Sequence, residues 1–297
     1  MSQPHVLTLI AAPGTALSLD YLVSPLTSSG VAFASITWLA PTIACDLVLN
    51  VAPPPHSYAE TLARCAQTQV DSALQPLAQR RKTLLISDMD STMIEQECID
   101  ELADVMGLKP RVSAITERAM NGELDFKEAL RERVALLATM PEAALQDVFD
   151  RRITLMPGAK TLVATMKAGG ATAHLVSGGF TFFTARVARA LGFDGHEANI
   201  LQAADGKLTG TVAEPILDKD SKRASLERLM EEKAIPREAT LAVGDGANDL
   251  PMILAAGLGV AYHAKPVVEA QAPVSIRHHN LTALLYLQGI PRDEWVE

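Results

Sequence analysis

The chain has 297 residues, of which 48% are hydrophobic and 21% are charged. This is ordinary globular usage, so it argues against a disordered, collagen-like or coiled-coil protein. The formal net charge of −9 would repel polyanions. No Lys/Arg cluster is longer than the Arg80-Arg81-Lys82 run, which we interpret as a solvated linker at a domain junction. We therefore expect no nucleic-acid partner.

The cysteines and the N-terminus indicate the compartment. Cys45, Cys65 and Cys98 are too far apart for a zinc knuckle or a paired-thiol motif, so we expect buried or free thiols in a reducing environment. The N-terminus lacks the charged start and apolar run of a signal peptide, and no stretch reaches about 18 apolar residues. The sequence thus predicts a cytoplasmic protein with no membrane partner.

Residues 1–78 alternate between strand and helix patterns. Apolar runs and periodicity predict strands at 5–11, 31–39, 44–51 and 70–74 and helices at 16–28 and 57–67. This βαββαβ order resembles an ACT-like domain, for which ligand sensing, dimerisation and scaffolding all remain open. Because exposed edges of such sheets often pair, we expect a homodimer.

The remaining residues predict a second, larger domain. Residues 83–87 form a continuous apolar strand of the kind that is buried on both faces of a parallel sheet. Two helical apolar stripes follow, so we expect residues 95–153 to be a helical cap inserted into a core made of residues 79–94 and 154–297. In that core, strands are predicted at 171–176, 239–243, 257–261 and 272–276, helices at 181–191, 220–233 and 281–287, and a further segment at 193–201. The predicted fold class is α/β, a Rossmann-like parallel sheet with a helical cap, preceded by an α+β domain.

Polar motifs follow three of the predicted strands. They are Asp88-Met89-Asp90-Ser91-Thr92, Ser177-Gly178-Gly179 and Gly244-Asp245-Gly246-Ala247-Asn248-Asp249. In open α/β sheets, ligands bind beyond the carboxyl ends of the strands. Each motif alone is typical of a turn or a solvated loop. Their joint occurrence at three strand ends favours a functional site.

The acids of these motifs predict a metal site. In extended backbone, Asp88 and Asp90 point to the same side, and two anions in one small volume require a cation or a shared proton. If a helix begins near Ala247, Asp245 and Asp249 are about one helical turn apart and could add oxygen ligands. An all-oxygen cluster of this kind suits Mg²⁺.

The second motif and a downstream lysine predict an anion site. Ser177 precedes two glycines and an expected helix, so its hydroxyl and free backbone N–H groups could converge on an anion, most naturally phosphate. Lys222, four residues after Asp218, could add a compact positive charge. Taken alone, however, Lys222 is typical of a surface lysine.

Together these residues resemble the haloacid dehalogenase superfamily. The match runs through Asp88, Asp90 and Thr92, then Ser177, Lys222 and residues 244–249. Within that superfamily, Asp-Met-Asp-Ser-Thr, Ser-Gly-Gly-Phe and the intervening cap resemble the phosphoserine phosphatases. The resemblance covers residues 82–290.

The resemblance implies a role for each matched residue. Asp88 would be the nucleophile that forms an aspartyl phosphate, and Asp90 the general acid and then base. Mg²⁺ would be held by the Asp88 carboxylate, the Asp90 backbone carbonyl and Asp245. Further matched residues would bind the phosphoryl group or support the site: Ser177, Gly178 and Lys222 on the phosphoryl oxygens, Asn248 nearby, and Asp249 and Thr92 in support.

Other matched residues would select the substrate. Glu97 would bind the substrate ammonium and Arg133 its carboxylate. Arg133 lies seven residues after Phe126 on an apolar stripe, where a guanidinium needs an anion or must extend from the stripe's edge. Met120 and Phe126 match positions that line the pocket, although either could be plain core.

The small-molecule substrate implied by the resemblance is O-phospho-L-serine, hydrolysed to serine and phosphate in the last step of serine biosynthesis. Two alternatives stay open from the sequence. One is a related phosphatase or phosphotransferase acting on another small phosphomonoester, such as phosphohomoserine. The other is a non-catalytic protein whose N-terminal unit senses an amino acid.

Overall fold

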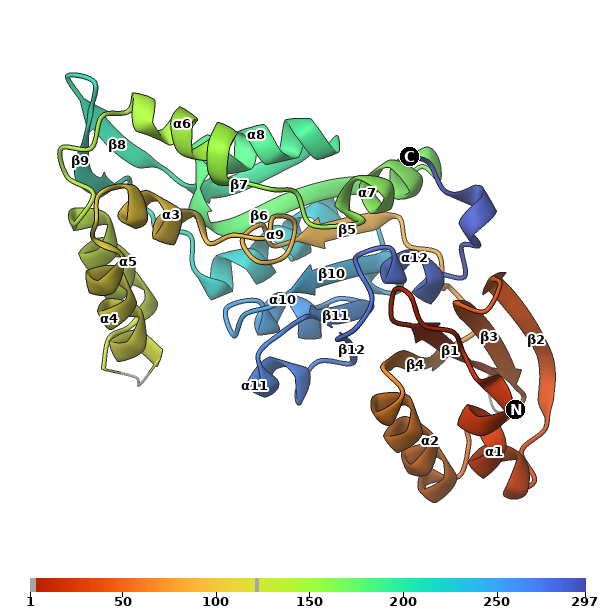
Figure 1. Cartoon of the computed structure of the whole chain (residues 1–297). Helices are drawn as coiled ribbons and strands as arrows, with labels where there is room; N and C mark the ends of the chain where they lie inside the picture. The colour runs from red at the N-terminus through yellow and green to blue at the C-terminus, as the bar shows by residue number, and fades with distance from the viewer. Residues whose placement is uncertain (1–3, 121–122) are drawn as a thin grey trace.

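The structure is a computed structural model that describes residues 4–120 and 123–297. The N-terminal unit and cap helices α4 and α5 lie at opposite ends of a central parallel sheet (Figure 1). Within the described ranges, no helix combines the length and the apolar character needed to cross a lipid bilayer. Cys45, Cys65 and Cys98 are all buried and free, as predicted.

The N-terminal unit is a four-stranded antiparallel sheet in the order β2-β3-β1-β4, with two helices packed on one face. The predicted βαββαβ order is observed as β1 (His5–Ala11), α1 (Leu19–Ser28), β2 (Phe33–Ala40), β3 (Ala44–Leu49), α2 (Pro55–Gln67) and β4 (Val70–Pro76). Helix α1 begins later than predicted, because the Leu17 N–H donates to the Thr42 carbonyl and residues 12–18 form a loop.

The core is a six-stranded parallel sheet in the order β12-β11-β10-β5-β6-β7. Its strands are β5 (Leu84–Ser87), β6 (Thr172–Phe180), β7 (Gly195–Asn199), β10 (Thr240–Gly244), β11 (Leu258–Tyr262) and β12 (Val274–Ile276). Alternate residues of β5 point to opposite faces: Leu84 and Ile86 belong to one buried cluster and Leu85 to another. The sheet is therefore buried on both sides, as the apolar run of β5 predicted.

Helices cover both faces of this sheet. Helices α9 and α10 contribute to the same cluster as Leu84, and α7, α8 and α12 to the cluster on the other face. The core helices are α7 (Ala159–Ala168), α8 (Thr181–Leu191), α9 (Lys219–Glu232), α10 (Leu250–Ala255), α11 (Pro266–Glu269) and α12 (Ala283–Leu287), with short 3₁₀ turns at Arg237–Ala239 and Arg292–Glu294. Helices α7 and α11 were not predicted, and α10 was considered only as a helix that would begin near Ala247.

The cap is helical, as predicted. It contains α3 (Cys98–Val105), α4 (Lys109–Met120), α5 (Phe126–Ala135) and α6 (Ala143–Arg152). The chain enters and leaves it at adjacent points, since Ile94 pairs with Leu155 and the Glu95 N–H donates to the Thr154 carbonyl at 3.0 Å. The cap is therefore joined to the core by two neighbouring segments.

A hairpin of the core, which the sequence analysis missed, contacts the cap. It consists of β8 (Leu201–Ala204) and β9 (Lys207–Val212). The Thr139 N–H donates to the Leu208 carbonyl at 2.9 Å, and the Leu208 N–H donates to the Met140 carbonyl at 2.8 Å. The loop between α5 and α6 thus pairs with β9 and fixes the cap against the core on this side.

The N-terminal unit is docked on the core through buried polar contacts. Asp71 accepts the backbone N–H groups of residues 277, 278 and 279 at 2.8 to 3.1 Å. Arg80 pairs with Asp46 at 2.6 Å, and its side chain is only 10% exposed. The interpretation of Arg80 to Lys82 as a solvated linker is therefore wrong for Arg80, because that guanidinium is buried between the two units. Arg81 is exposed as expected.

Candidate active site

The three predicted motifs meet at the carboxyl ends of the three adjacent strands β10, β5 and β6. Asp88 follows β5, Asp245 follows β10, and Ser177 lies near the end of β6, which continues to Phe180. Strand β6 loses its regular register between Val176 and Phe180, so the Ser177 motif departs from the ladder there. The sheet thus brings together residues that are far apart in the sequence.

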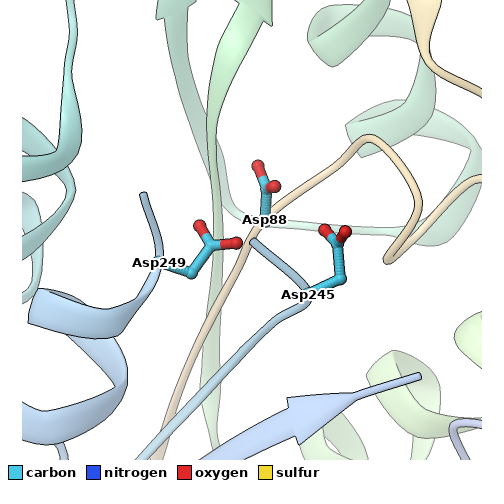
Figure 2. A group of neighbouring side chains, drawn as sticks. All are labelled: Asp88, Asp245 and Asp249. Atoms are coloured by element: carbon cyan, nitrogen blue, oxygen red, sulfur yellow. The ribbon is translucent and has the colours of Figure 1, made fainter. Parts of the chain in front are cut away.

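Three carboxylates form a cluster at this point. Figure 2 shows Asp88, Asp245 and Asp249 converging from neighbouring loops, and one oxygen of each lies within 4.8 Å of the others. Helix α10 begins at Leu250, not near Ala247, so Asp249 occupies the N-cap position and its Oδ2 accepts the Gly246 N–H at 3.0 Å. The condition that a helix begins near Ala247 is therefore not met, although both Asp245 and Asp249 reach the cluster.

Lys222, on the first turns of α9, is the cation of this cluster. Its Nζ lies 2.7 Å from Asp88 Oδ1 and 2.6 Å from Asp249 Oδ1, and its side chain is 1% exposed. It is therefore a buried site residue and not a surface lysine. Burial alone would lower the pKa of Lys222, but the carboxylates of Asp249 and Asp88 outweigh it and raise that pKa.

The acids are not fully compensated by Lys222. Burial raises the pKa of Asp88 well above its usual range, and the Asp249 carboxylate raises it further. Burial and Asp249 also raise the pKa of Asp245 to about 7. Despite the approach of Lys222, Asp88 Oδ1 has no hydrogen bond among the described residues. A buried cluster of carboxylate oxygens whose negative charge is only partly compensated by Lys222 fits a divalent cation such as Mg²⁺.

Asp90 lies beside this cluster and points toward the Ser177 motif. Residues 90–93 form a turn, so the expected extended geometry of Asp88 and Asp90 is wrong beyond Met89. The turn nevertheless directs Asp90 inward, since a Cβ on Gly179 would lie 2.7 Å from Asp90 Oδ2. Burial, followed by the nearby Glu97 carboxylate, raises the pKa of Asp90 to about 7. Such a carboxyl group can both donate and accept a proton near neutral pH.

The Ser177 hydroxyl and the Gly179 N–H lie beside Asp90. Ser177 is 1% exposed, and its Oγ accepts the Gly179 N–H at 2.8 Å. A Cβ on Gly178 would lie 3.1 Å from the Phe126 ring of the cap, so this position leaves little room for a side chain. Phe126 of the cap therefore packs against the Ser177 motif.

Two residues that the sequence analysis did not assign to the site hold it in place. Asn199, which is 2% exposed at the end of β7, donates to the Gly178 carbonyl at 2.9 Å and accepts the Leu217 N–H at 2.7 Å. The backbone N–H of Cys98 donates to Asp90 Oδ1 at 3.2 Å. The only sequence signal for Asn199 was an amide at the end of an expected strand segment.

The predicted substrate-binding residues face the site from the cap and its entry segment. Glu97 is the N-cap residue of α3, and its Oε1 accepts the Ser91 hydroxyl at 2.8 Å. Burial lowers the pKa of Arg133, while the carboxylates of Glu97, Asp100 and Asp90 oppose that shift. The Arg133 Nε donates to the Ala129 carbonyl of its own helix at 3.3 Å. The guanidinium therefore interacts electrostatically with the acids of the site without a direct ion pair to them among the described residues.

The remaining predicted residues contribute unequally. Thr92 Oγ1 lies 3.4 Å from Asp245 Oδ1, so Thr92 supports the acid cluster. Asn248 is half-buried in the loop before α10, and its Oδ1 occupies the space that a side chain on Gly246 would need. Met120 ends α4, and its side chain lies outside the described part of the chain.

Comparison with known proteins identifies the family. The sequence profile of the haloacid dehalogenase-like hydrolases matches residues 85–254, more than half of the chain. The chain therefore belongs to this family, and it is a hydrolase.

The curated relatives narrow this class. Phosphoserine phosphatase SerB2 of Mycobacterium tuberculosis is 38% identical over 296 residues, which cover 98% of this chain and 72% of the relative. A phosphoserine phosphatase of Polaromonas sp. is 48% identical over 209 residues, which cover 69% of this chain and 89% of the relative.

Solved structures agree with these relatives. A HAD family hydrolase from Salmonella enterica serovar Typhi has a TM-score of 0.84 at 31% identity, covering 98% of this chain and 99% of its own. A substrate-bound phosphoserine phosphatase has a TM-score of 0.65 at 38% identity, covering 69% of this chain and 98% of its own. The first similarity therefore includes the N-terminal unit.

Proposed function

We propose that this protein is a phosphoserine phosphatase, which hydrolyses O-phospho-L-serine to L-serine and phosphate. The observation that carries the proposal is the pairing of Asp88 with Lys222 at 2.7 Å, together with a protonatable Asp90 beside the Ser177 motif and an Arg133 of the cap that interacts electrostatically with Glu97. The names of the two curated relatives support phosphoserine over phosphohomoserine as the substrate. This reaction would be the last step of serine biosynthesis.

The reaction follows from the positions of these groups. An Asp88 carboxylate oxygen attacks phosphorus in line, and the bond between phosphorus and the serine oxygen breaks as Asp90 donates its proton to that oxygen. Asp90 then takes a proton from a water molecule, which attacks the aspartyl phosphate and releases phosphate. Lys222, the Ser177 hydroxyl and the Gly178 N–H hold the phosphoryl oxygens during both steps.

Mg²⁺ is the cofactor of this proposal. The Asp88 carboxylate, the Asp90 backbone carbonyl and Asp245 would hold it, with Asp249 in support. When bound, the ion offsets the negative charge of the phosphoryl group and of the acids around it. Asp249 also orients Lys222, to which it lies at 2.6 Å.

Substrate selection would rest on the cap. Glu97 would bind the ammonium group of phosphoserine and Arg133 its carboxylate, because a guanidinium and a carboxylate form paired hydrogen bonds. Phe126 and Asn248 would line the remaining space. A phosphomonoester without a carboxylate would gain nothing from Arg133.

The test replaces Arg133 by alanine and compares phosphoserine with phosphoethanolamine, which has the ammonium group but no carboxylate. We expect kcat/KM for phosphoserine to fall by about 100-fold, the effect of losing a charged hydrogen-bonded pair, and kcat/KM for phosphoethanolamine to stay within about threefold. The matched control is Arg131→Ala on the same helix, because Arg131 is exposed and paired with Glu214. Equal losses on both substrates would contradict the assignment.

We also propose that the N-terminal unit is an ACT-like domain and that the protein is a cytoplasmic homodimer. Strand β2 is an edge of its sheet, carries no charged residue or proline, and leaves Ile36 47% and Trp38 42% exposed. An edge without such protection pairs readily with another strand, here β2 of a second copy. A dimeric mass by light scattering that Trp38→Lys makes monomeric supports this, and a monomeric wild type contradicts it.

A further inference from the structure

The acids of the site outnumber its cations. Five carboxyl groups gather there against two cations, Lys222, which two of them already share, and Arg133, so the free site opposes the entry of an anionic phosphomonoester. The five groups are those of Asp88, Asp90, Glu97, Asp245 and Asp249. The net charge of −9 adds to this repulsion. A cation at the mouth of the site would therefore raise the rate of substrate capture.

Lys265 is an exposed lysine beside Asp245, on a loop that neither the motifs nor the mechanism uses. Strand β11 runs parallel to β10, with Ala261 opposite Gly244, so the residues after β11 lie beside those after β10. The Lys265 N–H approaches the Asp245 carbonyl at 3.4 Å. Lys265 is also the N-cap residue of α11, which fixes its backbone at the end of the loop.

The loop that carries Lys265 is held at its other end. The His263 N–H donates to the Ile276 carbonyl at 2.8 Å, and the His263 ring contacts the His279 carbonyl at 2.9 Å. Both partners belong to the segment at the end of β12. Lys265 is therefore presented from a loop anchored on both sides and next to Asp245.

The side chain of Lys265 is exposed and has no ion pair among the described residues, whereas Lys127, Lys167 and Lys222 each have one. Its charge nevertheless reaches two acids of the site. Burial is the largest influence on the pKa of Asp245 and of Glu97 and raises both, and Lys265 opposes it in both cases. The ammonium group thus interacts electrostatically both with Asp245 of the acid cluster and with Glu97 at the start of the cap.

We propose that Lys265 is a rim cation of the active site, which draws the anionic substrate to the mouth and weakens Mg²⁺ binding at Asp245. This rests on the proposed function for the choice of substrate. A single positive charge must act with opposite signs on an anion and on a cation at the same site. A loss of local structure would instead weaken both.

The experiment uses the full chain with Lys265→Met. We expect kcat/KM for phosphoserine to fall by about three- to tenfold at low ionic strength with kcat unchanged, and the gap to shrink in about 0.5 M NaCl. Calorimetric titration of the metal-free variant with Mg²⁺ should show binding about two- to fivefold tighter than in the wild type. Lys265→Arg should retain wild-type values in both measurements. Lys233→Met, at an exposed lysine beyond the end of α9, is the matched control and should change neither.

Either of two results overturns the proposal. If Lys265→Met weakens both substrate capture and Mg²⁺ binding, Lys265 holds the loop and does not act through its charge. If neither changes, its charge does not reach the site. The Mg²⁺ titration needs no substrate, so its result tests the role of Lys265 whatever the substrate is. If the wild-type protein fails to hydrolyse phosphoserine, that failure counts against the proposed function alone.

Discussion

Buried aspartates occupy two regions of this molecule, and their surroundings differ. At the domain interface, Asp46 accepts hydrogen bonds from Thr8 and Arg80, and Asp71 accepts three backbone N–H groups. Under the cap, Asp88 and Asp249 share Lys222, and Asp88 Oδ1 has no hydrogen bond among the described residues. A buried acid with a full set of partners stabilises the fold, whereas one with too few is available for chemistry.

The sharpest contrast should come from Asp88→Asn. We expect turnover to fall by at least about 10³-fold, because an amide is a poor nucleophile. The free energy of unfolding without metal should stay the same or rise, since the substitution removes a charge that Asp249 and Asp245 repel. Phosphate release and urea denaturation measure the two effects. Wild-type turnover in this variant would refute the assignment of the nucleophile.

The opposite pattern is expected at the interface. Asp71→Ala leaves three backbone N–H groups without their acceptor, which should cost about 3 kcal/mol of unfolding free energy and leave kcat within twofold. Arg81→Met is the control, because its ion pair with Glu294 is more than half exposed and should contribute less than about 0.5 kcal/mol. A lower kcat at unchanged stability in Asp71→Ala would erase the distinction between the two regions.

A smaller effect should appear in the pH dependence of stability. The pKa of Asp245 and of Asp90 is about 7 in the metal-free fold and about 4 in an unfolded chain. The folded state therefore binds these two protons more tightly than the unfolded chain does. Above pH 7 both carboxyl groups are ionised and lower the free energy of unfolding. As the pH falls from 7 toward 5 they become protonated in the folded state, and the free energy of unfolding rises.

Denaturation of the metal-free protein between about pH 8 and pH 5.5 tests this sign. Asp245→Asn should gain less stability than the wild type as the pH falls, and Mg²⁺ should reduce the wild-type gain because it compensates the same charges. Identical pH dependence in the wild type and the variant would show that Asp245 does not carry the effect.

Much of this arrangement could be predicted from the sequence. The apolar run of β5 and the acids after it fixed the strand end, and the two glycines after Ser177 indicated a backbone site. The β8–β9 hairpin was missed because its strands are short and mostly exposed, although Asp205-Gly206 is a typical turn pair between them. Helix α7 was missed although Leu162, Val163 and Met166 repeat with helical spacing.

Other features depend on contacts that no local pattern encodes. Arg80 was interpreted as exposed because its partner, Asp46, lies 34 positions earlier in the sequence. No local pattern around Arg80 indicates that pairing. Asn199 and Cys98 act on Gly178 and Asp90 through hydrogen bonds that exist only after the sheet and the cap are assembled. The start of α10 differed because the Asp249 carboxylate binds the Gly246 N–H and holds residues 245–248 outside the helix.

The adjacent entry and exit of the cap have a consequence for evolution. Since residues 94–95 and 154–155 lie side by side, an insertion between them can lengthen, shrink or be exchanged without altering any strand of the sheet. Asp88, Asp90, Asp245, Asp249 and Lys222 all belong to the part that such an exchange would leave intact. Descendant proteins can therefore acquire a new substrate preference by changes in the helical cap alone, while the reactive groups of the core stay the same.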